Sequence, residues 1–224
     1  MIAKELLQYE KDYIRYYINI PKLYYNENSE KDIIKNEMKE SVNQLIVDDI
    51  LMFMEMIEYN YNLSKENDVF VNCLTEFQVG YVSKNIISLA VEYSQLSGFS
   101  DISYIKAYNY DFNLRKELSL KDLFRCDVNF TKLLRKYINL QINNIFNEIS
   151  MYEDDGIGHF MEDDIILDEN NIFYFTDEYL ILPFSSCELH KDLVNLLEFK
   201  IPFNKIYYYL NEYAIKNIVK KVIL

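Results

Sequence analysis

Glycine, proline and cysteine are scarce in this chain of 224 residues, and tryptophan is absent. With 4 Gly and 3 Pro there is little material for long flexible linkers, so composition marks no domain boundary. The three cysteines, Cys73, Cys126 and Cys187, are odd in number and match no CxxC metal or redox spacing. We therefore expect free thiols and a single domain over residues 1–224.

Long apolar runs are also missing. A membrane-spanning helix needs about 18 consecutive apolar residues, and the richest run here, ILMFMEMI, is broken by Glu55. The N-terminal MIAKELLQYEKDY lacks the apolar core of a signal peptide. These absences predict a soluble, cytoplasmic chain without a membrane span. If a leader has been removed, the same domain would instead be extracytoplasmic.

Basic residues are in the minority, with 23 Lys plus Arg against 36 Asp plus Glu and a net charge of −13. Binding to nucleic acid requires clustered cations that displace counterions from phosphate, so nucleic acid is excluded as a partner. An acidic surface instead attracts cationic molecules. The 21 tyrosines fit either an A- and T-rich coding sequence or a tyrosine-rich binding surface.

Catalytic motifs are hard to find, since no GxSxG, phosphate-binding loop or dinucleotide-binding fingerprint occurs. The acidic segment EDDGIGHFMEDD, residues 153–164, offers carboxylates and His159 for acid–base or metal chemistry. It fails as a calcium loop because Gly156 at the turn position would put Met151 at the first ligand position. The cluster Cys187, Glu188 and His190 offers a thiol with a nearby base, but no oxyanion element accompanies it. A hydrolase using either segment is the alternative function, and we expect no cofactor and no metal.

The hydrophobic pattern predicts strands and helices in a definite order. Residues 13–25 are rich in Tyr and Ile and predict a strand, with Pro21 near an edge or bulge. Residues 30–58 follow a helical period, whose apolar stripe consists of Ile34, Met38, Val42, Ile46, Ile50, Phe53 and Ile57. The period then changes to two in 69–81, 87–93 and 102–112, which predicts an antiparallel meander. Residues 82–86 connect the first two of these strands, with Asn85 suited to a positive φ.

The second half of the chain continues with helices and short strands. Ser119 predicts a helix N-cap, with Asp122 at N3 as a weak capping box. Residues 129–149 predict a helix, the segments DIIL, NIFYF, YLILPF and LLEFKIPF predict strands, and residues 203–222 predict a final helix. The fold class is therefore α+β, with an antiparallel β-meander sheet packed against helices.

Several quoted segments carry a resemblance to a known family. IISLAVEYSQLSG, residues 86–98, and YIKAYNYDFNLRKELSLKDLF, residues 104–124, are followed later by FYFT, YLILPF and IPF. In this order they resemble the domain of unknown function shared by the anti-sigma factor RsiV and the peptidoglycan deacetylase PdaC. The match covers about residues 13–208 and leaves a C-terminal helical extension, 209–224. The resemblance implies a non-catalytic binding or sensing module, because RsiV-type domains recognise lysozyme and the PdaC copy accompanies a separate catalytic domain.

The two most distinctive loops of that family differ here. Where its members carry Gly-Gly-Ala-His, this chain has Ser97, Gly98, Phe99 and Ser100. Where they carry Tyr-Glu-Ile-x-Pro-Tyr, it has CELHK at 187–191, which keeps Glu188 and adds His190. We expect these six residues to bind a basic protein, with Phe99 as aromatic anchor and Glu188 as charge. Residues 94–101 and 184–192 are expected to emerge at one end of the sheet.

Overall fold

The structure is a computed structural model that describes residues 2–24, 33–64, 69–97, 101–150, 167–185 and 196–219. Its contacts divide the chain into two compact units, Met1–Leu118 and Ser119–Leu224. The α+β class is confirmed, whereas the assignment of all 224 residues to one domain stays a prediction.

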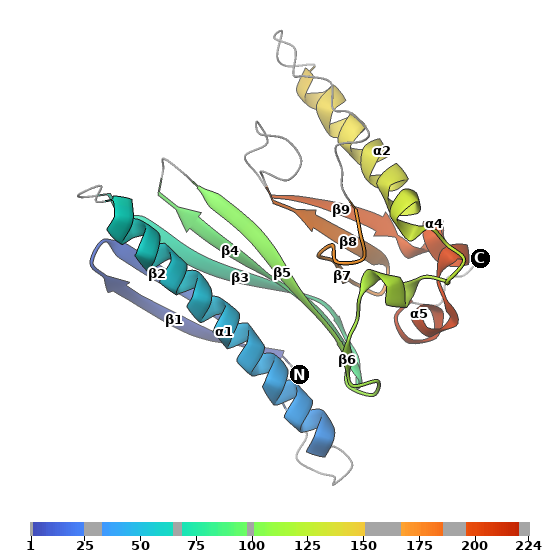
Figure 1. Cartoon of the computed structure of the whole chain (residues 1–224), viewed down its shortest axis with the longest axis horizontal. Helices are drawn as coiled ribbons and strands as arrows, with labels where there is room; N and C mark the ends of the chain where they lie inside the picture. The colour runs from blue at the N-terminus through green and yellow to red at the C-terminus, as the bar shows by residue number, and fades with distance from the viewer. Residues whose placement is uncertain are drawn as a thin grey trace. The chain divides into compact units, whose positions relative to one another are not determined.

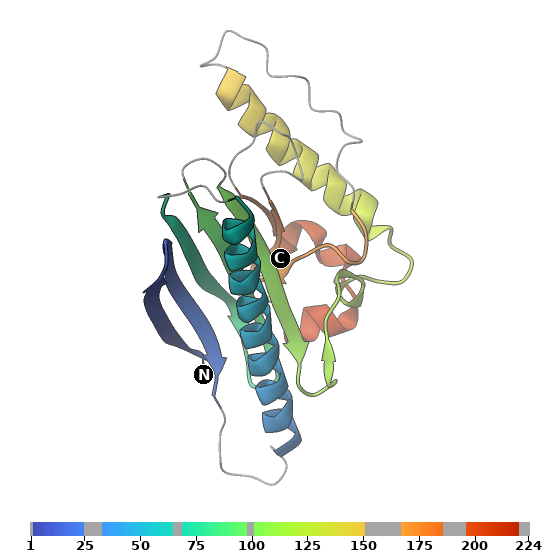
Figure 2. The same cartoon turned by 60° about the vertical axis from the view of Figure 1, so that its left-hand side comes forward.

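Unit 1 is a six-stranded sheet with one long helix (Figure 1). The strands follow one another across the sheet in chain order: β1 Ile2–Lys11, β2 Ile14–Leu23, β3 Val71–Val82, β4 Ile86–Leu96, β5 Ile102–Asp111 and β6 Lys116–Glu117. Helix α1, Ile33–Ser64, runs along one face of this sheet (Figure 2). The predicted helix and the three strands of the predicted meander are all present.

One strand pair departs from the antiparallel pattern, because β2 and β3 are parallel. The helix between them explains the direction. With 32 residues, α1 is about 48 Å long, enough to return the chain along the whole of β2 before β3 begins. Strand β1 was not predicted, since Leu6 and Leu7 are adjacent and spoil the alternation of a half-buried strand.

Side chains complete the backbone pairing where β2 separates from β3. The last residue pair between these strands is Ile18 with Thr75. Beyond it, the Thr75 hydroxyl accepts from the Asn19 N–H at 2.9 Å and donates to the Asn19 carbonyl at 3.0 Å. On α1, the buried Asn43 amide does the same for Leu23, at 2.8 and 3.1 Å. Strand β2 lies inside the sheet, but Pro21, which has no N–H, lies beyond the last residue pair with β3, where no donor towards β3 is needed.

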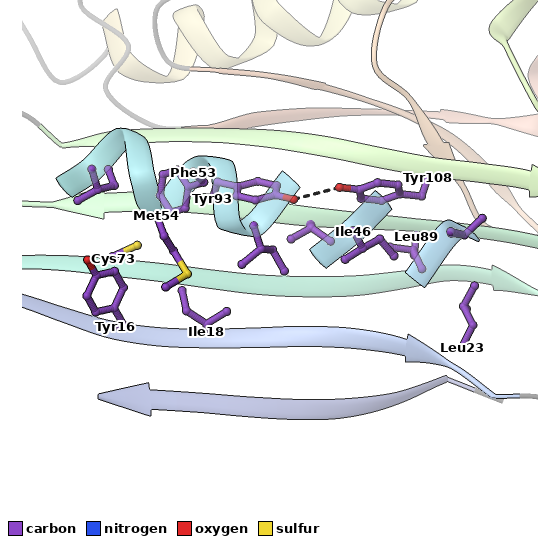
Figure 3. Close-up of a cluster of buried hydrophobic side chains, with 14 of the residues drawn as sticks. Tyr16, Ile18, Leu23, Ile46, Phe53, Met54, Cys73, Leu89, Tyr93 and Tyr108 are labelled. Carbon is purple, nitrogen blue, oxygen red and sulfur yellow. Dashed lines mark hydrogen bonds between the residues drawn. The ribbon is translucent and has the colours of Figure 1, made fainter. Parts of the chain in front are cut away.

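The core of unit 1 lies between α1 and the sheet (Figure 3). Five residues of the predicted helical stripe are buried there: Val42, Ile46, Ile50, Phe53 and Ile57. The first predicted residue, Ile34, is 42% exposed near the start of the helix. From the sheet, Tyr16, Ile18, Cys73 and Leu89 pack against the stripe. The period of the sequence thus located the core-facing side of α1.

The predicted positive φ of Asn85, in the turn between β3 and β4, is wrong. Among the described residues other than glycine, only Asp12 and Arg115 have a positive φ, both 55°. Asn85 therefore does not adopt the left-handed conformation that the sequence suggested. Instead, the Ser83 hydroxyl accepts from the Ile86 N–H at 3.0 Å and closes the β3–β4 turn. A side-chain hydrogen bond has taken the place of a special backbone conformation.

Unit 2 combines one helix of 21 residues and several short helices with a second, three-stranded antiparallel sheet of order β7-β8-β9. Its elements are η2 Leu120–Leu123, α2 Phe130–Ser150, β7 Tyr174–Phe175, β8 Tyr179–Phe184, β9 Leu197–Pro202, α4 Phe203–Ile206, η4 Tyr207–Tyr209 and α5 Glu212–Asn217. The predicted capping box is present at the start of η2. The Ser119 N–H donates to Asp122 Oδ2 at 2.9 Å, and the Ser119 hydroxyl donates to the same oxygen at 3.0 Å.

The predicted continuous C-terminal helix is wrong. Leu210 forms a β-bridge with Phe124, which interrupts the helical backbone. Asn211 then starts a new helix, since its side chain accepts from the Ala214 N–H at 2.9 Å. Leu210, Ala214 and Ile218 recur at every fourth position of this segment and are all buried.

Candidate functional site

The two loops that the sequence singled out leave different sheets. Residues 94–101 end β4 and lead into β5 of the six-stranded sheet, whereas residues 184–192 follow β8 of the three-stranded sheet. The expectation that both emerge at one end of a single sheet is therefore wrong. Of the six proposed binding residues, the structure describes only Ser97; Gly98, Phe99, Ser100, Glu188 and His190 lie outside the described residues. The acidic segment 153–164 also lies outside them.

The base of the β4–β5 loop is fixed by a side chain. The backbone N–H of Ser97 donates to Asp101 Oδ1 at 2.8 Å, which closes the loop across its two ends. Two apolar side chains flank this point, Leu96 with 38% and Ile102 with 44% of their surface exposed. An ordered loop base with exposed aliphatic neighbours is suited to contact with another protein.

Aromatic side chains lie at the same end of this sheet. Pairing of Ile14 with Val71 brings the preceding residues, Tyr13 and Phe70, to the end where β4 finishes (Figure 2). Their ring centroids are 5.4 Å apart, and 37% of the surface of Tyr13 and 38% of that of Phe70 remains exposed. The Arg15 guanidinium lies 3.9 Å from the centre of the Phe70 ring. We call this end of the sheet the loop end, and its exposed apolar and aromatic residues are Tyr13, Phe70, Leu96 and Ile102.

A carboxylate on α1 receives two donors from β5. Lys106 Nζ donates to Asp49 Oδ1 at 2.6 Å, and the Tyr108 hydroxyl donates to Asp49 Oδ2 at 2.8 Å. The Tyr108 hydroxyl also forms a hydrogen bond with the Tyr93 hydroxyl (Figure 3), and the two oxygens are 3.0 Å apart. Burial raises the pKa of both tyrosines, so they remain neutral hydrogen-bonding groups at physiological pH.

A second carboxylate on α1 repeats this arrangement towards β1 and β2. Glu58 accepts from Lys11 Nζ at 2.7 Å and from the Tyr16 hydroxyl at 2.9 Å. Nine residues make about two and a half helical turns, so Asp49 and Glu58 lie on opposite flanks of the apolar stripe. The Lys11 hydrogen bond, followed by that of Tyr16, lowers the pKa of Glu58.

These carboxylates attach the helix to the sheet. In each, one oxygen accepts from a lysine and the other from a tyrosine, so charge-assisted hydrogen bonds join the helix to a strand on either side. Within the described residues, no group of three or more His, Cys, Asp or Glu is placed to hold a metal ion. No helix in that part of the chain is long and apolar enough to cross a membrane.

The described cysteines carry free thiols, as the sequence predicted. Cys73 is buried beneath α1, and burial raises its pKa to about 12. Cys126 is exposed. Cys187 lies outside the described residues, so the predicted thiol–base cluster stays a prediction.

Sequence reasoning missed Tyr13 and Phe70 as surface residues. Both belong to apolar segments, and the sequence treated such segments as strand or core. They lie at strand ends and are only partly covered: the Tyr61 ring of α1 is 6.3 Å from that of Tyr13, and Arg15 of β2 lies over the Phe70 ring. More than a third of each residue stays exposed. The only local signal was their position within the first two residues of the predicted strands 13–25 and 69–81, beside the turn at Asp12 and before Val71.

Comparison with known proteins identifies the fold. No family model matches the sequence, and no curated protein matches it. Two solved structures of DUF3298 family proteins are similar. The one from Bacteroides fragilis has a TM-score of 0.57 and 16% identity, covering 98% of this chain and 97% of that chain. The one from Pseudomonas aeruginosa has a TM-score of 0.59 and 11% identity, covering 95% of both chains. This chain therefore shares the fold of DUF3298 family proteins, a family of unknown function.

Proposed function

We propose that this chain is a non-catalytic binding or sensing module that recognises a basic protein at the loop end of unit 1. The observation that carries the proposal is the presence of four exposed apolar or aromatic residues at the end of the sheet where β4 finishes and β5 begins: Tyr13, Phe70, Leu96 and Ile102. Interfaces are enriched in aromatic residues, and loops on a rigid sheet tolerate the variation that recognition needs. Phe99, within this loop, is the anchor of the proposed site.

The charge of the chain supports a cationic partner. The excess of 36 acidic over 23 basic residues raises the rate at which a basic protein would associate, and salt would weaken that attraction. The resemblance to the domain shared by RsiV and PdaC points the same way, since RsiV-type domains recognise lysozyme, which is strongly basic. That resemblance also favours an envelope-related ligand and an extracytoplasmic location. Glu188 and His190 form a second, separate part of the proposal.

Affinity capture with the purified chain, from lysate and from secreted fractions, would identify the partner, with lysozyme as a defined probe. Binding would then be measured by biolayer interferometry over a range of salt concentrations. We expect Phe99→Ala and Phe70→Ala each to weaken binding about tenfold or more, the effect of removing an aromatic anchor. Glu188→Ala should weaken binding mainly at low salt.

The matched control is Leu114→Ala. Leu114 is 53% exposed in the turn after β5, at the opposite end of that strand from Ile102, so its truncation should leave affinity unchanged. Salt-independent binding, or equal losses from Phe70→Ala and Leu114→Ala, would contradict the placement of the site. Hydrolytic activity lost on changing His159 or Cys187 would instead support the alternative hydrolase.

A further inference from the structure

The outer edge of β1 is the longest open strand edge of the six-stranded sheet. Strand β1 is first in the strand order and pairs only with β2, so its other side has no strand partner among the described residues. It is ten residues long, and every residue from Lys4 to Lys11 is exposed. Its backbone N–H and C=O groups on that side form a template for another strand.

Apolar side chains accompany this open backbone. Leu6 is 60%, Leu7 41% and Tyr9 38% exposed. Leu7 lies across from the buried Ile18, and the Tyr9 ring stacks on Tyr16 with centroids 4.5 Å apart. The core-facing side of the sheet thus continues onto β1 and ends uncovered there. A strand added outside β1 would cover Leu7 and Tyr9.

The charges of β1 fit a second copy of the same strand. Its two lysines, Lys4 and Lys11, and its two glutamates, Glu5 and Glu10, sum to zero in a chain of net charge −13. Two copies can therefore approach along this edge without the repulsion that their overall charges would cause. Charges of a single sign along this edge would instead place like charges opposite each other and oppose self-pairing.

Backbone geometry restricts how two copies could pair. Along β1, residues whose backbone groups bond to β2 alternate with residues whose backbone groups face the open edge. In an antiparallel pair, residues of the same kind stand opposite each other, so their two residue numbers are both odd or both even and their sum is even. The register centred on Leu7 meets this rule and opposes Lys4 to Glu10 of the second copy, twice by symmetry. The register centred on Leu6 would oppose Lys4 to Gln8, and the one centred on Gln8 would shorten the overlap by two residues.

We propose that this chain forms a symmetric dimer through antiparallel β1–β1 pairing centred on Leu7, which joins the two six-stranded sheets into one. This interface lies along the β1 edge and is distinct from the loop end, so it can hold whether or not the proposed basic partner exists. Within the described residues Lys4 makes no ion pair, whereas Glu10 is bonded to Arg15 at 3.0 Å. Pairing would give Lys4 an opposing carboxylate.

Charge reversal gives a direct test by sedimentation equilibrium of the full chain, whose monomer mass is 27.0 kDa. In a dimer of the Lys4→Glu variant, a glutamate faces a glutamate at each end of the interface. In a dimer of the Glu10→Lys variant, a lysine faces a lysine at each end. Each variant alone should dimerise about tenfold more weakly, because two attractive cross-strand pairs become repulsive. An equimolar mixture of the two variants should dimerise as well as the wild type, since every substituted side chain then faces a side chain of opposite charge. The double variant should also dimerise.

The restored mixture guards against misfolding, because an unfolded variant would not recover on mixing. Circular dichroism of each single variant would check that the secondary structure is unchanged. A wild-type chain that stays monomeric at all accessible concentrations would overturn the proposal. So would a dimer that the single variants leave intact, because another surface would then hold it. Failure of the mixture to dimerise would exclude the register centred on Leu7.

Discussion

Replacing Asp49 with alanine should destabilise unit 1 far more than the same change at its neighbour Asp48. Among the described residues, Asp49 is the only acceptor of Lys106 Nζ, and it also accepts from the Tyr108 hydroxyl. Its side chain is 14% exposed, whereas that of Lys106 is 37% exposed. The lysine can return to water when its partner is removed, but the buried Tyr108 hydroxyl cannot.

The expected cost follows from this difference. A hydrogen bond to a charged group contributes about 1.5 to 3 kcal/mol. The partly exposed ion pair is screened and adds less than about 1 kcal/mol. Without Asp49, the Tyr108 hydroxyl can still bond to the Tyr93 hydroxyl. Only one of the two hydroxyls can donate in that bond, so the other buried O–H is left without an acceptor. We therefore expect Asp49→Ala to cost about 2 to 3 kcal/mol, and Asp48→Ala less than about 0.5 kcal/mol, as at an ordinary surface position.

Urea unfolding followed by circular dichroism would measure these costs, with hydrogen exchange of α1 assigning the loss to unit 1. A double-mutant cycle between Asp49→Ala and Tyr108→Phe isolates their shared hydrogen bond and should give a coupling of about 1 to 2 kcal/mol. Equal costs at Asp48 and Asp49 would refute the helix-anchoring role. Additivity of the two changes within about 0.5 kcal/mol would do the same.

Three further measurements follow from the ionisable groups. The pKa of Glu58 is lowered by Lys11 and Tyr16, so its contribution to folding stability is present above about pH 4.5 and is lost as pH falls. The difference in unfolding free energy between wild type and Glu58→Gln should therefore narrow from pH 6 to 3, and a constant difference would contradict this. Burial raises the pKa of Tyr16 and Tyr108, so stability should fall as pH rises above about 10, and their phenolate absorbance should appear with unfolding rather than before it. A thiol reagent should modify exposed Cys126 in the native chain but buried Cys73 only on unfolding, with three thiols titrating in denaturant without reductant.

Much of the fold was predictable because its signals are local. The helical period of residues 30–58 identified α1 and most of its buried side, and the period of two identified β3, β4 and β5. The Ser119–Asp122 capping box was also predictable, since both of its partners lie within one turn of chain. Side-chain periodicity depends only on the geometry of a single element, so it can be read without knowing the neighbours.

The candidate site was predictable only as a loop. The sequence indicated residues 97–100 by resemblance, but it could not show that Tyr13 and Phe70, far apart in the chain, reach the same sheet end. That meeting depends on the parallel β2–β3 pair. The parallel direction results from the length of α1 and from strand pairing between distant residues, neither of which leaves a mark in the local pattern.

Composition and period by themselves determined the acidic character, the α+β class and the side of α1 that is buried. Tertiary structure alone decided that the strands form two sheets and that β1 pairs as an edge strand. It also decided that Asp49 and Glu58 anchor α1, whereas other acidic residues of the helix face solvent. Each of these outcomes depends on which distant backbone or side chain lies opposite a given residue. The sequence gives only the residue type, so it cannot distinguish a carboxylate that accepts from a lysine and a tyrosine from one that is exposed to solvent.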